Sequence, residues 1–551
     1  MSNRIAHKKA DIPLPVLRRS PVVAAIAGGL PIARTHLRSI PTAFYVVLFL
    51  VGMVALWSIL CTISHRSPDA DNIEELLWAS SFEWGYYKHP PMPTWILYPL
   101  TLLFGKSIWL TFFAGQLSSA LALWFVWKLG CEFTTSRRAL IAMLMVSVTA
   151  YFSLRATIYN HNSAQMWSIV ASTWLYYRAL RYHRTLDWFW LGVACAAAVL
   201  TKYSAIIQFA AFFVFFVWHG NWRDRRALAG ALIALTSFSV VMVPHLYWLL
   251  DHRFEPVLYA NNSIVTTPGE HFRVGVEFLG FLNTQLGRLS PLFVAWAALF
   301  LWNRRTAGTQ DALRAADGTH RYAQALSEWD RSFLLIVGLA PVTLTLIATA
   351  ILGTHLGSSW GSTFFVFFGF YTYWWLAGDE RVNLWRTVVV VVVIQLVLAA
   401  GYAVGRGPLA FYTGYKTNST YPGAAISHRM QTIWREYVPG APLTLIAANT
   451  WLGGNVAVHM HKSANVFIDA DLKKSPWLEE HDIKRCGMLI AFSNGDHGAE
   501  PSAAVRRLYE AAPYKGTFEQ RWSVPGSFLL EIHWAIIPPS ASCHGATNEI
   551  R

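Results

Sequence analysis

Charged residues are scarce in this chain of 551 residues. Asp, Glu, Lys and Arg together make up 14% of it, whereas a soluble domain usually carries about 25%. Hydrophobic residues make up 54% and aromatic residues 15%. The composition therefore argues against a string of soluble domains and favours an integral membrane protein.

Signatures of several other protein classes are missing as well. The five cysteines show no CxxC or Cys/His spacing, which gives no sign of a zinc site or a disulfide framework. Cys486 and Cys543 could pair if the C-terminal part is extracytoplasmic. We find no internal repeat, and the C-terminal part has no glycine-rich nucleotide motif.

The excess of positive charge has a topological explanation. The net charge is +14, from 45 Lys and Arg residues against 31 Asp and Glu residues. These charges sit in short segments between apolar runs, as in the positive-inside signals of membrane proteins. We therefore expect no nucleic-acid partner.

Apolar runs recur through the first three quarters of the chain. About 20 apolar residues cross a bilayer core of ~30 Å. We expect eleven spans, near residues 42–64, 106–127, 138–154, 161–180, 187–201, 204–219, 227–250, 289–303, 332–352, 361–377 and 387–405. The fifth and sixth are interpreted as two helices joined by a tight turn, because one continuous helix would run ~50 Å.

Charge also predicts the orientation. With the N-terminus in the cytoplasm, the inside segments hold 22 Lys and Arg residues and the short outside segments hold 7, as the positive-inside rule requires. Residues 1–41 are then a basic cytoplasmic tail and residues 42–405 a membrane domain with outside loops 65–105 and 251–288. Eleven spans place residues 406–551 outside.

From about residue 406 the composition turns polar, and no run is long enough to span. We expect buried strands at residues 443–448, 487–492 and 527–532, and helices at residues 424–437 and 500–512. Strands alternating with helices predict an α/β domain. The expected fold is mostly α: a polytopic transmembrane helical bundle with a small C-terminal α/β domain.

The first outside loop concentrates groups that can do chemistry. Four carboxylates follow the first span within seven residues: Asp69, Asp71, Glu74 and Glu75. The loop continues with a basic and aromatic cluster: Tyr86, Tyr87, Lys88 and His89. One interpretation is a helix N-terminus capped by an aspartate. The other is a site where one group takes a proton and the others neutralise a leaving phosphate.

This loop resembles a known family. The pattern Asp71-x-x-Glu74 followed by Gly85-Tyr-Tyr-x-x-Pro-Pro-x-x-x-Trp95 is similar to the GT-C superfamily of membrane glycosyltransferases. It is most similar to the bacterial branch related to dolichyl-phosphate-mannose protein mannosyltransferases, which includes aminoarabinose transferases of lipid A and rhizobial galacturonosyltransferases of lipopolysaccharide. Three further stretches agree: Ile158–Asn162, Leu200–Ser204 and Asn449–Asn455 with Ser475–Trp477. The resemblance covers roughly residues 42–540.

The resemblance implies an inverting glycosyltransferase (EC 2.4 class) in a bacterial inner membrane, with a periplasmic C-terminal domain. Its donor would be a polyprenyl-phosphate sugar, and its acceptor a cell-envelope glycolipid such as lipid A or lipopolysaccharide core. Asp71 is the implied general base, with Glu74 beside it. The implied substrate-binding residues are Asp69, Tyr86, Tyr87, Lys88, His89, Asn160, Asn162, Lys202 and Arg273. Because polyprenyl phosphate leaves readily, neither a metal nor another cofactor is required.

Two departures from the family pattern stand out. His89 occupies the position before Pro-Pro where aminoarabinose transferases have a lysine, and Lys88 lies one residue earlier. Where many relatives carry a second acid near the fourth span, this chain has Asn160, His161 and Asn162. A neutral amide can orient a sugar but cannot share the role of base.

Two other functions remain as alternatives. A transporter or flippase would also be polytopic, but it usually places ionisable residues within its spans and shows repeated halves. A non-catalytic assembly subunit of the envelope would not need acids beside Lys88 and His89.

Overall fold

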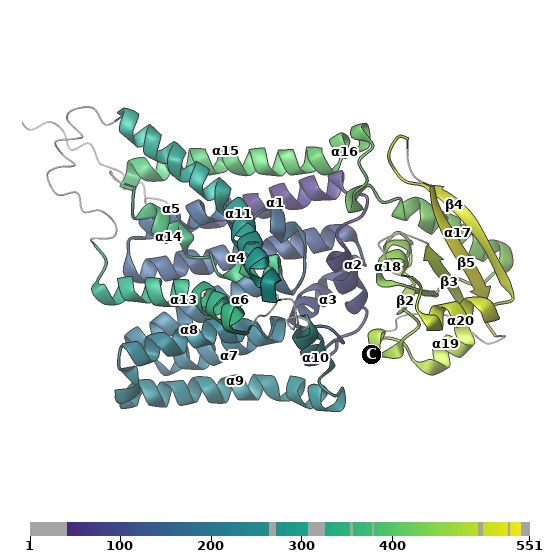
Figure 1. Cartoon of the computed structure of the whole chain (residues 1–551), viewed down its shortest axis with the longest axis horizontal. Coiled ribbons are helices and arrows are strands. Elements are labelled where there is room, and N and C mark those ends of the chain that lie inside the picture. Colours follow the sequence, from purple (N-terminus) through teal and green to yellow (C-terminus); the bar gives the residue numbers. More distant parts are fainter. Residues whose placement is uncertain are drawn as a thin grey trace, which may run out of the picture.

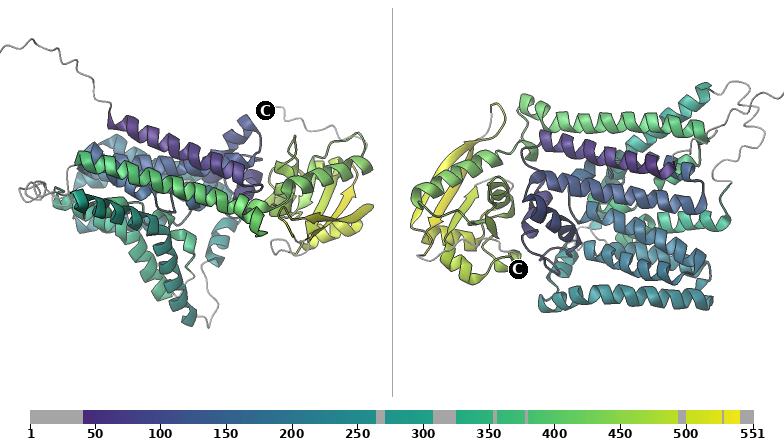
Figure 2. Two further views of the ribbon diagram at one scale, coloured as in Figure 1. Left: turned by 90° about the horizontal axis from the view of Figure 1, so that it is seen from above. Right: turned by 180° about the vertical axis from the view of Figure 1, so that it is seen from behind.

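The computed structural model describes residues 41–263, 271–306, 325–352, 356–376, 380–493, 500–526 and 529–540. These residues form a bundle of long helices with a smaller sheet-containing domain packed against one end (Figure 1). The view from behind shows the same arrangement, with the sheet domain beyond the helix ends (Figure 2).

Long apolar helices build the bundle. Within the described ranges, six helices contain a stretch long and apolar enough to cross a membrane: α1 (Thr42–Ser64), α4 (Ile108–Phe133), α9 (Arg225–Asp251), α11 (His271–Thr306), α13 (Glu328–Leu352) and α15 (Glu380–Arg406). Four further helices lie among them: α5 (Ser136–Ser147), α6 (His161–Tyr182), α7 (Thr185–Thr201) and α8 (Ala205–Trp218). The expected transmembrane helical bundle is confirmed, while the number of spans stays a prediction.

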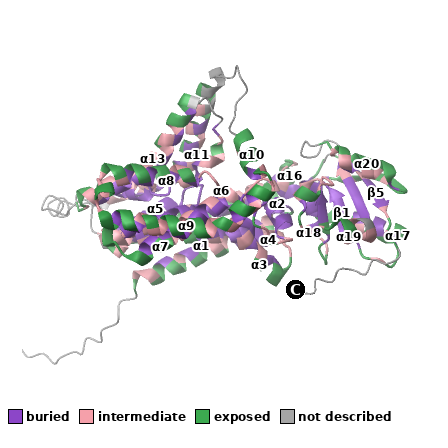
Figure 3. Ribbon diagram, turned by 90° about the horizontal axis from the view of Figure 1, so that it is seen from below, coloured by how far each residue is buried: buried purple, intermediate pink, exposed green. Residues whose placement is uncertain are grey.

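The outer faces of the bundle are apolar. Leu48, Val51 and Ile63 of α1 are each more than half exposed, and Figure 3 shows exposed residues along α1 and α9. A groove of about 750 Å³ between α1 and α4 is lined almost entirely by apolar side chains. Apolar faces on long helices suit a protein that is surrounded by lipid. A helix also pairs its backbone polar groups internally, as the bilayer core requires.

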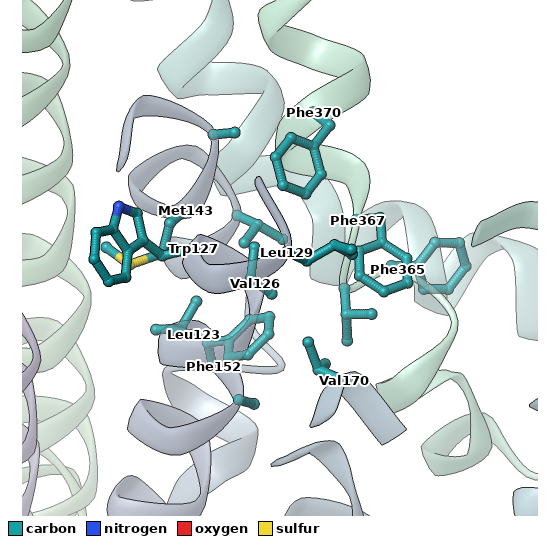
Figure 4. Close-up of a cluster of buried hydrophobic side chains, with 14 of the residues drawn as sticks. Leu123, Val126, Trp127, Leu129, Met143, Phe152, Val170, Phe365, Phe367 and Phe370 are labelled. Atoms are coloured by element: carbon teal, nitrogen blue, oxygen red, sulfur yellow. The ribbon is translucent and has the colours of Figure 1, made fainter. Parts of the chain in front are cut away.

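The interior of the bundle is packed with large apolar side chains. Figure 4 shows one cluster of them: Leu123, Val126, Trp127, Leu129, Met143, Phe152, Val170, Phe365, Phe367 and Phe370. Some of the buried polar groups pair across helices. The Trp57 indole donates to Gln395 Oε1 at 2.9 Å, and Gln395 Nε2 donates to the Ser147 carbonyl at 2.8 Å. These bonds tie α1, α15 and α5 together.

Two of the expected spans agree closely with the structure, and one takes a different form. The tight turn is confirmed, because α7 ends at Thr201 and α8 begins at Ala205. The single helix expected at 361–377 is wrong: a 3₁₀ helix, η4 (Ser358–Thr363), and the short α14 (Phe368–Tyr373) stand there. A Cβ on Gly369 would lie 1.9 Å from the Ala142 carbonyl oxygen. The segment is thus buried in protein, where irregular backbone is tolerated at membrane depth.

Helix boundaries also differ from expectation. α5 ends at Ser147, earlier than the expected 154, and η1 (Leu154–Thr157) follows. α11 begins at His271, well before the span expected at 289–303. Its 36 residues correspond to ~54 Å, longer than the ~30 Å bilayer core, and one part of α11 projects from the bundle in Figure 3.

Short helices cover the end of the bundle that faces the sheet domain. They are α2 (Ala70–Trp78), α3 (Met92–Phe104), α10 (Glu255–Asn262) and α16 (Pro408–Thr413). α2 and α3 belong to the outside loop 65–105, and α10 belongs to the loop 251–288. In Figure 1, α2, α3 and α10 lie between the long helices and the sheet.

The C-terminal domain contains a mixed sheet of order β2-β1-β3-β5-β4. Its strands are β1 (Leu445–Ala448), β2 (Asn465–Ile468), β3 (Met488–Ser493), β4 (Tyr514–Arg521) and β5 (Leu529–Ile537). β1 pairs in parallel with β2 and β3, whereas β5 runs antiparallel to β3 and β4. The helices are α17 (Gly423–Tyr437), α18 (Thr450–Val458), α19 (Glu480–Cys486) and α20 (Ala503–Ala511). The α/β domain is confirmed, with two strands more than expected.

Contacts join this domain to the bundle. A Cβ on Gly454 of α18 would lie 2.2 Å from Ile73 of α2, so the two helices approach closely. Ser67 donates to Asn455 at 2.5 Å, and Lys473 forms an ion pair with Glu255 of α10 at 2.8 Å. The sheet domain therefore sits directly on the helix that carries the loop carboxylates.

Candidate active site

The four loop carboxylates have four different environments. Asp69 caps α2, because its Oδ1 accepts the Ala70 N–H at 2.9 Å. Asp71 lies in the first turn of the same helix and is exposed. Glu74 and Glu75 are buried. The capping interpretation thus applies to Asp69, and Asp71 is left as the accessible carboxylate.

Asn160 holds Asp71 in place. Its Nδ2 donates to Asp71 Oδ2 at 2.7 Å. Its Oδ1 caps α6 by accepting the N–H groups of Asn162 and Ser163 at 2.8 and 3.2 Å. Because the cap uses the amide oxygen, the NH₂ group must point at the carboxylate.

Glu74 and Lys88 form a partly buried ion pair. Their Oε1 and Nζ atoms are 2.7 Å apart, and Tyr87 donates to the same oxygen at 3.1 Å. Although burial lowers the pKa of Lys88, the Glu74 carboxylate outweighs it and raises that pKa above its ordinary value. Glu74 is therefore occupied by a cation and a phenol, which leaves Asp71 better placed than Glu74 to take a proton.

Glu75 is buried with only one hydrogen-bond donor in the described structure. Its Oε2 accepts from Thr94 at 2.8 Å. Burial raises its pKa to about 8, with smaller contributions from the charges of Glu74 and Asp71. Glu75 is thus mostly protonated at neutral pH and supports the packing of α2.

Among the residues expected to bind the phosphate, Lys202 stands out because its ammonium group forms no ion pair with a described residue. It lies in the turn between α7 and α8, and its Nζ donates to Asn162 Oδ1 at 2.7 Å. No carboxylate of the described residues lies within ion-pair distance of it. Burial lowers its pKa to about 7, so an anion bound beside it would favour the charged form.

His89 lies among other aromatic rings. Its ring lies against that of His161, with centroids 3.8 Å apart and the planes tilted by 42°, and meets Tyr259 of α10 edge-on at 5.7 Å. Burial and the nearby Lys202 and Lys88 lower its pKa to about 3. His89 is therefore neutral and can donate a hydrogen bond, but it adds no positive charge for a phosphate.

Two other expected residues contribute little visible chemistry. Tyr86 is 2% exposed, stacks on Trp78 and donates to the Ser81 carbonyl at 2.9 Å, which makes it a packing residue of the loop. Arg273 lies on α11, but its side chain is outside the described residues.

The structure adds residues that sequence reasoning missed. Arg288 of α11 reaches the site and donates to the Ser358 carbonyl. Lys474 of the C-terminal domain lies over the Tyr87 ring, 5.7 Å from its centroid, and Tyr259 lies beside Lys88. An arginine inside an apolar helix is a signal that could have pointed to Arg288. Within the described ranges, no group of three or more His, Cys, Asp or Glu side chains could hold a metal ion.

Comparisons with known proteins agree with this architecture. The family model of dolichyl-phosphate-mannose-protein mannosyltransferases matches residues 88–248. The crystal structure of ArnT from Cupriavidus metallidurans bound to undecaprenyl phosphate aligns with a TM-score of 0.54 at 14% identity, covering 90% of this chain and 98% of ArnT. This chain has the GT-C fold. Apo ArnT aligns with a TM-score of 0.50 at 14% identity, over 89% of this chain and 98% of that one.

A curated relative extends the comparison to sequence. The lipopolysaccharide core galacturonosyltransferase RgtA of Rhizobium johnstonii is 22% identical over 431 residues, which cover 74% of this chain and 79% of RgtA. The resemblance to bacterial GT-C enzymes inferred from the first outside loop is confirmed. Together the matches show that the chain is similar to multi-pass membrane glycosyltransferases of the GT-C type.

Proposed function

We propose that this GT-C protein transfers a sugar, with inversion, from a polyprenyl-phosphate donor to a lipopolysaccharide-type acceptor. The observation that carries the proposal is the exposed Asp71 carboxylate, held by Asn160 near the unpaired ammonium of Lys202. Two relatives support it: ArnT was solved with undecaprenyl phosphate, and RgtA is named for the lipopolysaccharide core. The acceptor would be lipid A, the core or another envelope glycolipid.

The reaction needs one base and one cation. An acceptor hydroxyl gives its proton to Asp71 as its oxygen forms a bond to the anomeric carbon of the donor sugar. The bond between that carbon and the phosphate oxygen breaks from the opposite face, so the anomeric configuration inverts. The electron pair leaves with polyprenyl phosphate, and Lys202 stabilises the growing charge.

We further propose that the transfer uses no metal or other cofactor. Phosphate monoesters are good leaving groups, and the charge that a metal would neutralise can be met by lysine and arginine side chains at the site. His89, being neutral, would donate a hydrogen bond to the phosphate rather than a charge.

We place the site on the periplasmic side of a bacterial inner membrane. The excess of Lys and Arg in the predicted inside segments supports a cytoplasmic N-terminus. Cys486 is disulfide-bonded, and disulfides persist in oxidising compartments such as the periplasm. Its expected partner, Cys543, lies outside the described residues.

Substitution of the base tests the proposal. Asp71→Asn keeps the shape of the side chain, and its amide oxygen can still accept from Asn160. It removes the basicity, which is typically worth 10²–10⁴-fold in rate, or about 3–5 kcal/mol of barrier. Transfer in membranes containing equal amounts of protein should fall by at least about 10²-fold.

Asp69→Asn is the matched control, because Asn caps helices about as well as Asp. It should retain most of the activity. If both variants transfer sugar at the wild-type rate, the loop acids are structural, as they would be in an assembly subunit or a transporter. If only Asp69→Asn is inactive, Asp69 and not Asp71 is the base.

A further inference from the structure

The C-terminal domain places an uncommon turn against the first outside loop. Asp469 and Ala470, which follow β2, both have a positive φ, at 54° and 56°. Asp adopts this left-handed conformation more readily than most residues, whereas Ala is strained in it. Two consecutive residues of this kind raise the energy of the backbone. Such conformations persist where the surrounding structure holds them, and they cluster at functional sites.

Hydrogen bonds on several sides hold the turn. The Asp469 N–H donates to the Ala448 carbonyl at 2.9 Å, and Ser502 donates to the Asp469 carbonyl at 2.7 Å. The Asp469 carboxylate accepts from Lys474 Nζ at 2.7 Å. The side chains of Asp469 and Lys474 are nevertheless 26% and 31% exposed. The backbone thus fixes this ion pair while leaving it open to a ligand.

The turn lies at the edge of the sheet where α/β domains bind ligands. It follows the carboxyl end of β2, and α18 follows the carboxyl end of the parallel strand β1. In Figure 1, α18 and β2 lie on the side of the domain that faces α2 and α10. Open sheets with parallel strands bind ligands outside those carboxyl ends. In this chain that edge faces the proposed active site.

Aromatic rings of the membrane domain face the ion pair. Lys474 Nζ lies 5.7 Å from the centroid of the Tyr87 ring. Lys88 Nζ lies 5.3 Å from the same centroid and 5.9 Å from that of Tyr259, whose side chain is exposed. Aromatic rings beside a few fixed polar groups are typical of small-molecule sites. A sugar suits such a site, because its C–H face can lie on a ring while its hydroxyls bond to the polar groups.

The position of the ion pair relates it to the acceptor. Tyr87 donates to Glu74 at 3.1 Å, and Glu74 lies three residues after Asp71 on α2, on the same face of the helix. The proposed phosphate ligand instead belongs to the turn between α7 and α8, within the bundle. A sugar that offers its hydroxyl to Asp71 can therefore extend a neighbouring sugar toward Asp469 and Lys474.

The charges of the pair decide which ligand fits. Asp469 and Lys474 neutralise each other, so together they offer one hydrogen-bond acceptor and one donor without net charge. A phosphate would meet the Asp469 carboxylate as well as the ammonium group, and like charges repel. A neutral sugar can donate one hydroxyl to Asp469 and accept from Lys474 with another. The pair thus favours a neutral sugar over an anionic group.

We infer that Asp469 and Lys474 form an acceptor subsite, which holds a neutral sugar residue next to the one that receives the transferred sugar. This inference rests on the proposed function and adds to it that the C-terminal domain binds the acceptor glycan. The ring of Tyr87 lies against the apolar face of that sugar.

Glycan binding tests the subsite without any turnover. The probe is the core oligosaccharide from lipopolysaccharide of a strain that lacks the gene, freed of lipid and of phosphate. Its Kd for the full-length protein would be measured by calorimetry. Asp469→Asn and Lys474→Gln should each raise this Kd by about 10–10²-fold, as expected for a lost hydrogen bond to a charged group. Asn is also tolerated in left-handed backbone, so Asp469→Asn should keep the turn.

Two controls separate glycan binding from domain packing. Lys473→Gln removes the neighbouring lysine and its ion pair with Glu255 of α10, and it should keep the wild-type Kd for the oligosaccharide. All three variants should bind polyprenyl phosphate with the wild-type affinity, which also shows that they are folded. If Asp469→Asn and Lys474→Gln lose affinity for this lipid as well, the pair does not act on the acceptor and the inference is wrong.

Other outcomes also overturn the subsite. If the wild type does not bind the phosphate-free oligosaccharide, or if both variants bind it as tightly as the wild type, the pair holds no sugar. If Lys474→Gln weakens only the binding of the oligosaccharide that retains its phosphates, the lysine holds an anion and the inference is wrong.

The inference and the proposed function fail in different ways. Transfer to the lipopolysaccharide of the deletion strain, in membranes that contain the native donor, tests the function separately. If transfer occurs while both variants bind and react like the wild type, the subsite is overturned and the function stands. If the wild type binds the oligosaccharide but transfers no sugar, the proposed function fails and the acceptor role of the pair fails with it.

Discussion

The contact between Asn160 and Asp71 predicts how activity depends on the positioning of the proposed base. Asn160→Ser keeps a good cap on α6, but a serine side chain is too short to reach Asp71, so the donated bond of 2.7 Å is lost. Asn160→Asp also keeps the cap, and it replaces the donor by a second carboxylate facing Asp71. The pair of variants separates loss of a hydrogen bond from addition of a like charge.

The size of the effect follows from the chemistry of the contact. A hydrogen bond to a charged group contributes about 1.5–3 kcal/mol, which corresponds to about 10–10²-fold in rate at 1.36 kcal/mol per decade. In Asn160→Ser, where the carboxylate is no longer held in place, kcat/KM should therefore fall by about 10–10²-fold. In Asn160→Asp it should fall further, because the second carboxylate repels the first.

The assay is sugar transfer in membranes, with protein amount and thermal unfolding measured for each variant. Both variants should keep the helix cap and hence near wild-type stability. If both transfer sugar at the wild-type rate, Asn160 does not act on the proposed base, and the assignment of Asp71 loses its geometric support. A loss of activity in Asn160→Asp alone would show that the amide serves only to avoid repulsion.

Three further predictions use other groups. Glu75, with a pKa raised by burial from 4.5 to about 8, holds a proton in the folded state that the unfolded chain releases, so stability should fall with rising pH across that window. The free energy of unfolding should fall by up to about 1.4 kcal/mol per pH unit, and Glu75→Gln should flatten this fall when thermal unfolding is followed across the pH range. Equal slopes in the wild type and the variant would contradict the prediction. The KM for donor should rise above about pH 7, where Lys202 loses its proton, and Lys202→Arg should extend tight binding to higher pH; a KM independent of pH would exclude Lys202 as the phosphate ligand. A reporter active only outside the cytoplasm should work when fused after Gly407 and stay silent after Gly318, and the reverse pattern would overturn the orientation.

Much of the fold could be predicted because lipid imposes a simple rule on sequence. Helices such as α1 and α9 are uniformly apolar over a bilayer's thickness, and the turn before Ala205 follows from length alone. The segment 361–377 is equally apolar, yet it is not one helix, because its environment is protein rather than lipid. Composition shows that a segment is buried but not which material surrounds it.

The same limit applies to the C-terminal sheet. The strands found by sequence have interior positions in the sheet, and β3 is an almost unbroken apolar run. β4 lies at the edge of the sheet and alternates between exposed and half-buried residues, most of them polar. β2 spans four residues of which only three are buried, so its apolar run is shorter than that of β1, whose four residues are all buried.

The site was predictable where its residues follow one another in the chain. Asp71, Glu74 and Lys88 share one loop, so their proximity could be expected, whereas the pairing of Lys88 with Glu74 needed the fold. Arg288 lies far from that loop in sequence and reaches the site only because α11 begins early and crosses the bundle. Sequence reasoning thus proposed Asp71 as the base but did not find Arg288.

The C-terminal domain completes the surroundings of the loop residues. Gly454 allows α18 to lie against α2, and Lys474 reaches from the domain to the ring of Tyr87, which bonds the same carboxylate oxygen as Lys88. An ion pair between Lys473 and Glu255 joins the domain to α10 as well. The domain therefore contacts both loops that are predicted to lie outside, and a change in how it packs would move the helix that carries the proposed base. This coupling gives a physical reason for the C-terminal domain to be attached at this end of the bundle.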